Sequence, residues 1–270
     1  DHVYTRQLYA GIGHKQFGEL TYGNMVTITD EVTQSDLANT YSLTDGLLET
    51  SARRVAQYVY NGDYGSNKVK FGAYYGGSSK RDIKNVDLKN NRKNTWGTGL
   101  IFDHEIDSIQ NVTVAAGFTR EISENANKTA YYSNAYALGL AYNFVHTTYG
   151  LDFAHKDTKN KDGAGNKVKN NEVTAVIRQG LNEDWNVYAM YSYKTEKTLP
   201  VGSAYSKSTD RQFLVGTEYY VYNQGSLKVK PFLEWQATRT KYENTFDKDS
   251  GKQLDRSRDF KTVIGLRAYW

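Results

Sequence analysis

The chain has 270 residues, with 34 basic and 30 acidic side chains and a formal net charge of +4. Its mean hydropathy of −0.71 is low for a globular core of this size, and no apolar run approaches the roughly 18 residues that a transmembrane helix needs. The absence of cysteine excludes disulfides and thiolate chemistry. Disorder is disfavoured as well, because 23 Tyr, 10 Phe and 4 Trp supply more aromatic surface than disordered chains carry.

The first elements predicted along the chain are two strands joined by a tight turn at KQFG, near Lys15. The stretch 24–53 then departs from the alternating pattern for about thirty residues. It combines leucines with five carboxylates, and loops this long are usually functional or disordered. A solvated surface loop would not need those leucines, so the stretch is predicted to fold inward and pack on a wall. The five carboxylates are Asp30, Glu31, Asp36, Asp45 and Glu49.

From residue 54 onward, alternation with a period of two recurs almost everywhere, which predicts β-strands. In LKVKPFLEWQAT, from Leu227, one face is largely apolar and the other carries lysine, glutamate and glutamine. A two-sheet sandwich shows the same alternation. Two features favour a membrane barrel: the apolar faces end in Tyr, Trp or Phe, as an aromatic girdle requires, and the segments are about ten residues long.

The joints between strands alternate between short turns and long charged stretches. The short turns begin near residues 15, 61, 105, 145, 182 and 222, and the long stretches near 81, 124, 160, 199 and 243. Outer-membrane barrels have short periplasmic turns and long extracellular loops. The sequence therefore predicts an all-β, antiparallel transmembrane barrel with about 13 strands in this chain.

The last strand, KTVIGLRAYW, keeps its alternation to the final residue, Trp270. If this strand ends on the short-turn side, the first strand begins on the long-loop side. Bacterial single-chain barrels have an even number of strands, with both termini in the periplasm. We therefore expect an odd number of leading strands to precede this sequence, and a miscounted hairpin is the alternative explanation.

Alternation also predicts which charges face the lumen, because each would cost about 2–4 kcal/mol as Lys or Arg in the middle of a lipid-facing strand. Pro231 removes a hydrogen bond from its strand, so a bulge is expected there. The predicted lumen charges are Lys70, Asp152, Arg178, Glu218, Lys228, Lys230, Glu234, Lys261 and Arg267.

Three stretches resemble the general diffusion porins of Gram-negative outer membranes, most closely the Pasteurellaceae-type major porins. They are RQLYAGIGHKQFGELTYGN from Arg6, the acidic loop that follows, and the terminal VIGLRAYW. The resemblance implies one barrel domain over 1–270, 16-stranded in the full protein, with three more strands before Arg6. Residues 24–53 would be the constriction loop, and Trp270 would be read by the barrel assembly machinery.

In that family, wall arginines face carboxylates on the inward loop and create a transverse field. By resemblance, Arg6 and Arg53 are the wall arginines, with Arg54 as the alternative if the register differs by one. Asp36 matches the first loop carboxylate, whereas Thr40 stands where a second acid is common. The remaining acids of the constriction site, which would compensate, are Asp30, Glu31, Asp45 and Glu49.

These observations predict a trimeric outer-membrane channel for ions and small hydrophilic solutes, in contact with lipid and lipopolysaccharide. An adhesin or receptor acting through long loops is the alternative. The five histidines lack metal-ligand spacing and no serine has a G-x-S-x-G context, so neither enzyme activity nor a cofactor is expected. The lysine-rich loops lack a stacking platform, so nucleic acid is not expected either.

Overall fold

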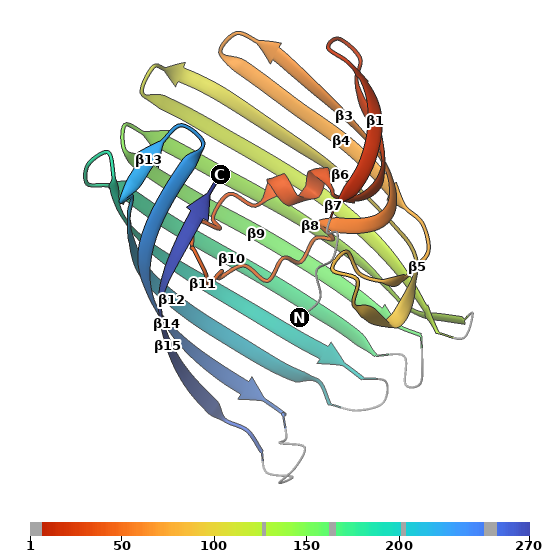
Figure 1. The fold of residues 1–270 in the computed structure, drawn as a ribbon. Helices are drawn as coiled ribbons and strands as arrows, with labels where there is room; N and C mark the ends of the chain where they lie inside the picture. The colour runs from red at the N-terminus through yellow and green to blue at the C-terminus, as the bar shows by residue number, and fades with distance from the viewer. Residues whose placement is uncertain (1–6, 126–127, 162–165, 201–203, 246–252) are drawn as a thin grey trace.

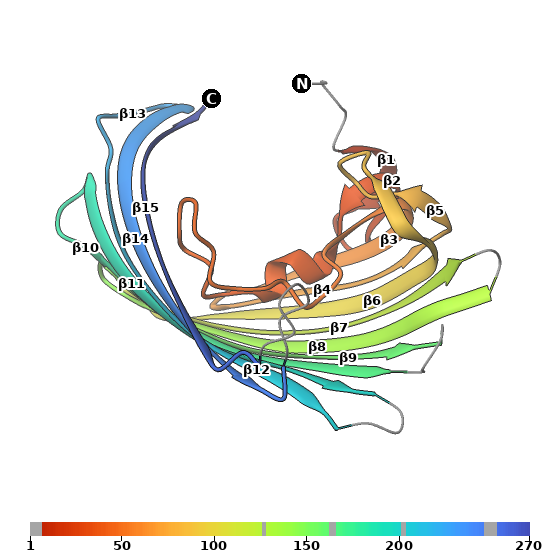
Figure 2. The same cartoon turned by 90° about the horizontal axis from the view of Figure 1, so that it is seen from below.

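The computed structural model describes residues 7–125, 128–161, 166–200, 204–245 and 253–270. They form a single antiparallel sheet curved into a trough, with one long loop lying inside it (Figures 1 and 2). Except for two short strands, each strand pairs with its neighbours in chain order, from β1 at one edge to β15 at the other. This confirms the predicted all-β antiparallel barrel architecture and the inward fold of the loop.

Within the described residues, thirteen strands have seven residues or more, and two have three residues each. The two short strands, β5 and β13, pair only with β6 and β14. In chain order the strands are β1 (Leu8–His14), β2 (Gly18–Val26), β3 (Ser51–Tyr64), β4 (Asn67–Gly76), β5 (Ser79–Arg81), β6 (Asp87–Asp107), β7 (Gln110–Asn125), β8 (Lys128–Phe144), β9 (Thr147–Asn160), β10 (Lys167–Gly180), β11 (Trp185–Leu199), β12 (Ser206–Tyr219), β13 (Tyr222–Gln224), β14 (Leu227–Glu243) and β15 (Arg256–Tyr269).

The two faces of the sheet differ as the alternation predicts. The inner face, against which the loop packs, holds the buried residues of both hydrophobic clusters. The outer face exposes leucine, valine and aromatic side chains on every long strand from β3 to β15. Aromatic residues are paired across strands there, as with Tyr75 and Trp96. An apolar band edged by aromatic rings is the outer surface that a bilayer requires.

The two edges of the sheet, β1 and β15, are not paired with each other in the described residues (Figure 2). The expectation that further strands complete a 16-stranded barrel concerns segments outside this sequence and stays a prediction. Among the described residues, no helix is long and apolar enough to cross a membrane.

Two local expectations were wrong. The stretch from Glu124 is not a long loop, because β7 ends at Asn125 and β8 begins at Lys128. Pro231 causes no bulge, since it pairs with Leu266 of β15 in unbroken register. On its other side the neighbouring strand is interrupted between β12, whose last pair is Glu218 with Phe232, and β13. The missing N–H of proline therefore falls at a gap in the ladder, where no strand partner requires it.

Candidate functional site: the inward loop and the barrel wall

The loop between β2 and β3, residues 27–50, leaves the wall and returns to it at the same place. The backbone N–H of Thr27 donates to the carbonyl of Thr50 (2.8 Å). The carbonyl of Glu49 accepts hydrogen bonds from the hydroxyls of Thr29 (2.8 Å) and Tyr74 (2.9 Å). These bonds close the neck of the loop, so its intervening residues can extend across the lumen from a fixed base.

Apolar side chains anchor the loop at two places on the inner wall. Ile28 and Val32, in the short 3₁₀ turn η1 (Ile28–Val32), pack with Leu48 in a cluster that includes Val55 and Tyr74. Leu43 packs in a second cluster with Val176, Tyr188, Met190 and Leu214, on β10 to β12. Burying one such side chain contributes about 1.5–3 kcal/mol. The leucines that predicted an inward fold are therefore among its anchors.

Glycines on the inner face allow the loop to lie directly on the strands. Gly72, Gly99 and Gly117 are neighbours across β4, β6 and β7. A Cβ atom at Gly72 would lie 2.9 Å from Ile28 Cγ1, and one at Gly117 would lie 2.8 Å from Val32 Cγ2. The series of glycines under the loop continues on β8 and β9 with Gly139 and Gly150, which face Gln34. Nothing in the sequence pattern showed that these glycines accommodate the loop.

Carboxylates of the wall hold the loop by its backbone. Asp152 of β9 accepts from the backbone N–H groups of Gln34 (2.9 Å) and Ser35 (2.7 Å) and from the Ser35 hydroxyl (2.5 Å). Glu172 of β10 accepts from the N–H of Asp45 (2.9 Å). Such charge-assisted bonds are about twice as strong as neutral ones. Asp152, a predicted lumen charge, and Glu172, which was not singled out from the sequence, therefore both hold the backbone of the loop.

The tip of the loop has the densest network, centred on Glu234 of β14. Its two carboxylate oxygens accept from the N–H groups of Asn39 (2.5 Å), Thr40 (3.0 Å) and Tyr41 (2.9 Å). The Tyr188 hydroxyl donates to the same carboxylate (2.6 Å). Glu234 is fully buried. A buried charge is tolerated only when it is paired or hydrogen-bonded, and here the backbone of the loop supplies most of that solvation.

The acids of the loop pair with lysines of the wall. Glu31 forms an ion pair with Lys70, Glu49 with Lys156 (3.0 Å) and Asp45 with the buried Lys194. The predicted opponents Arg53 and Arg54 form none of these pairs. Lys156 and Lys194 were not singled out from the sequence, because their partners lie more than 100 residues away along the chain.

Asp36 is an exposed residue of the inward loop, and its role as a constriction acid stays a prediction. Loss of water raises the pKa of the Asp36 carboxyl, while a hydrogen bond from Ser42 and the charge of Arg267 oppose that shift. Arg267 also donates to the carbonyl of Asn39 at the tip of the loop. Asp30 lines a cavity of about 300 Å³ near the neck, together with Glu31 and Lys70.

Arg53 and Arg54 sit at a bulge where β3 carries two residues opposite Asn24 of β2. Arg54 has a positive φ of 56° there. Both line a cavity of about 630 Å³ at the long-loop end of the lumen, with Lys80, Arg81 and Arg92. Arg92 is buried and donates to the carbonyls of Arg53 (2.5 Å) and Gly77 (3.0 Å). Arg6 lies outside the described residues.

The remaining predicted lumen charges lie on the far wall. Glu218 accepts from Lys230 (2.6 Å) and Arg178 (2.5 Å), and it also binds the Asn39 amide (2.8 Å). Lys261 pairs with Asp259 (3.1 Å). Lys228 and Lys261 are exposed on the inner face, opposite Tyr269 and Gln236 respectively.

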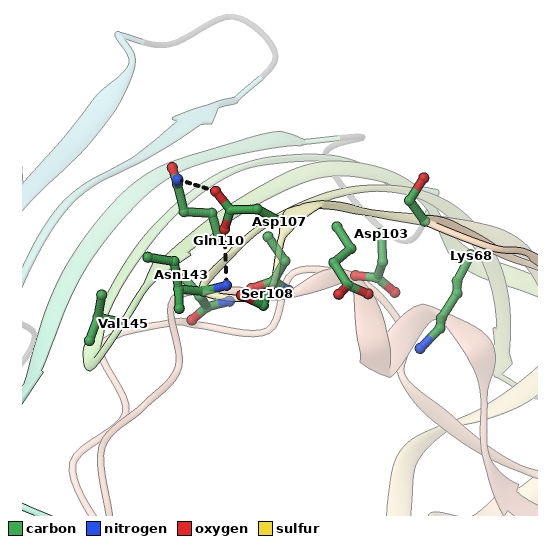
Figure 3. Close-up of a pocket in the computed structure, with 11 residues that line it drawn as sticks. Lys68, Asp103, Asp107, Ser108, Gln110, Asn143 and Val145 are labelled. Atoms are coloured by element: carbon green, nitrogen blue, oxygen red, sulfur yellow. Dashed lines mark hydrogen bonds between the residues drawn. The ribbon is translucent and has the colours of Figure 1, made fainter.

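One cavity at the short-turn end of the lumen is acidic. A cavity of about 540 Å³ is lined by Asp103, Glu105 and Asp107, with Lys68 as its cation (Figure 3). Asp107 is held by the backbone N–H of Ile109 (2.9 Å) and by the amide of Gln110 (2.8 Å). No group of three or more potential metal ligands of the kind His, Cys, Asp or Glu occurs in the described part of the chain. The part of the wall near β3 to β7 therefore has a basic cavity at its long-loop end and an acidic cavity at its short-turn end.

A strongly curved antiparallel sheet with an apolar outer band, a charged inner wall and an inward-folded loop defines an outer-membrane β-barrel of the channel-forming class. Comparison with known proteins places the chain within that class. The chain belongs to the Gram-negative porin family, whose sequence profile matches residues 1–230.

Two similar curated proteins are major outer membrane proteins of Pasteurella multocida. One is 23% identical over 99% of this chain, and one from strain Pm70 is 21% identical over 87%. The chain spans 68% and 64% of the lengths of these two relatives.

Two solved structures share the fold at low sequence identity. OmpT of Vibrio cholerae, expressed in the outer membrane, has a TM-score of 0.66 and 16% identity over 99% of this chain and 81% of its own. An anion-selective porin from Comamonas acidovorans has a TM-score of 0.63 and 15% identity over 94% of this chain and 75% of its own.

Proposed function

We propose that the protein is a diffusion channel that passes ions and small hydrophilic solutes across the outer membrane, without catalysis or cofactor. Membership of the porin family supports this function, and one structural observation carries it. The backbone of the loop 27–50 donates hydrogen bonds to carboxylates of β9, β10 and β14, and these bonds hold the loop inside the trough, on the inner wall (Figure 2).

Conductance in a planar bilayer tests this function. The purified protein is expected to insert as a pore with a steady, ohmic current, because its inner wall is charged and hydrated. Inserted protein that carries no current would contradict the proposal and favour a closed barrel that acts as an adhesin or receptor. A matched recording with heat-denatured protein controls for detergent leakage.

We further propose that the protein assembles as a homotrimer in contact with lipid and lipopolysaccharide, after insertion by the barrel assembly machinery through Trp270. One OmpT structure of Vibrio cholerae is described as a trimer form, which supports this oligomeric state. Chemical crosslinking in outer membranes should yield a ladder that ends at three copies.

The basic cavity that Arg53 and Arg54 line at the long-loop end is proposed to set ion preference. Replacing Arg53 and Arg54 by glutamine is expected to shift selectivity toward cations, because both line the cavity at the long-loop mouth. The reversal potential in a KCl gradient measures this shift. Lys84→Gln with Lys89→Gln removes the same charge from the neighbouring hairpin, outside the residues that line the cavity, and should have a smaller effect. Equal shifts in both double variants would contradict a role for the arginines in the constriction.

A further inference from the structure

The outer surface of the barrel carries a row of three arginines. Arg211 of β12 lies directly opposite Arg239 of β14, which lies directly opposite Arg258 of β15. Residues opposite one another in an antiparallel pair share a face, with Cβ atoms about 4.5–5.5 Å apart. The inner face of these strands is marked by Leu214, Glu234 and Gln236, which have the other parity. The arginine row therefore points outward.

More cations lie on the same outward face, one step further toward the long loops. Lys241 is opposite both Thr209 and Arg256, and Lys207 is opposite Glu243. A surface cavity of about 320 Å³ is lined by residues of this cluster, including Arg211, Arg239, Lys241 and Arg256. We define the outer basic patch as Lys207, Arg211, Arg239, Lys241, Arg256 and Arg258.

Among the described residues, the patch has too few acidic partners to balance its charge. Glu243 lies 4.0 Å from Lys207 and 3.7 Å from Lys241, and Asp255 lies 3.8 Å from Arg256. Within the described residues, none of the three arginines of the row forms an ion pair. Like charges directly opposite one another destabilise a sheet. Three in succession, all exposed, therefore form a row whose mutual repulsion an external anion would relieve.

The position of the row along the strands shows where that anion would come from. On β14 the outward residues below Arg239 are all apolar, namely Val229, Pro231, Leu233, Trp235 and Ala237. Val229 to Ala237 spans about 27 Å along a strand at about 3.4 Å per residue. With a tilt of about 40°, this covers about 20 Å of the apolar band of about 25 Å. The row thus lies at the border of the band.

Exposed aromatic rings mark that border just below the arginines. Phe213 and Phe260 flank Ala237 in the adjacent outward row, and Trp235 stacks against Phe260 with ring centroids 6.2 Å apart. Aromatic girdles sit at the level of lipid headgroups. The border is the one near the long loops, and in an outer-membrane barrel these loops are extracellular.

We propose that the outer basic patch binds the phosphate groups of a phosphorylated lipid headgroup in the outer leaflet. Arginine suits this role because its planar fork of donors binds phosphate oxygens in pairs. Acyl chains of the same lipid would lie on the aromatic and aliphatic residues below. The proposal depends on the outer-membrane location and not on conduction, so it can fail while the channel function holds.

The test measures binding of diphosphorylated lipid A to the purified full chain in detergent. We expect saturable binding that weakens as salt rises, with at least tenfold weaker binding of dephosphorylated lipid A and no competition by millimolar inorganic phosphate. The variant with Arg211→Gln, Arg239→Gln and Arg258→Gln should bind diphosphorylated lipid A at least tenfold more weakly, with unchanged conductance. Lys80→Gln with Lys84→Gln and Lys89→Gln removes equal charge at the same end of the barrel and should bind as the wild type does.

The melting temperature of a single variant, Arg239→Gln, gives a second readout. Its difference from the wild type should change sign when lipid A is added. Without lipid, Arg239→Gln should raise the melting temperature, because it removes like-charge repulsion on both sides. With saturating diphosphorylated lipid A, the same variant should melt below the wild type. Equal binding of both lipid A forms, equal binding by the triple variant, or loss of trimer in that variant with lipid binding intact would overturn the proposal.

Discussion

Glu234→Ala is expected to raise the single-channel conductance and to add noise to the open-channel current. The wild-type carboxylate holds three consecutive backbone N–H groups at the tip of the loop, from Asn39 to Tyr41. Each hydrogen bond to a charged group contributes about 1.5–3 kcal/mol. Without them the tip has no comparable restraint on β14, so it should sample positions away from the wall.

Two measurements separate this effect from general destabilisation. The chain has no cysteine, so a spin label at Thr40→Cys reports on the tip alone; it should gain mobility in the Glu234→Ala background. Gln236→Ala is the matched control, because Gln236 is also buried on the inner face of β14, and among the described residues its side chain bonds only Thr238 (3.5 Å). If label mobility and current noise match those of the control, Glu234 does not restrain the tip.

The fold was predictable because its signals are local. Alternation with a period of two, aromatic ends and the order of short and long joints all lie within ten or twenty residues of one another. The inward loop was predictable for the same reason, since Leu43 and Leu48 stand among its carboxylates. Each of these patterns reflects the solvent that a residue faces, and a sequence records that preference directly.

The pairing within the site was not predictable, because it depends on register across the whole sheet. Asp152 and Glu234 lie 118 and 195 residues from the loop atoms they bind. Alternation assigned both to the inner face, but it could not distinguish a charge that meets water from one that meets backbone N–H groups. The same limit applies to Lys194, whose partner Asp45 is 149 residues away. The composition of the loop indicated that it would pack against the inner face of the sheet. It did not indicate which residues of that face would hold it.

A second large change in conductance is expected when one of the glycines under the loop is replaced by a bulkier residue. Gly139→Val is expected to raise conductance by lifting the middle of the loop, while the strands keep their pairing. A Cβ atom at Gly139 would lie 2.8 Å from both Asp152 Oδ1 and Gln34 Cγ, and closer still to the carbonyl of Val32. The strand cannot yield, because β8 is paired on both sides. The loop must therefore move, and overpacking of this kind costs about 1–3 kcal/mol.

Ala116→Val is the control for added bulk, because Ala116 lies between the exposed Leu100 and Leu138 on the outer face. It should leave conductance unchanged. The double variant of Gly139→Val and Glu234→Ala should raise conductance by less than the sum of the single effects, because both release one loop whose neck stays closed at Thr27 and Thr50. Full additivity would mean that the wall glycine and the wall carboxylate restrain independent segments, and that the loop does not move as a unit.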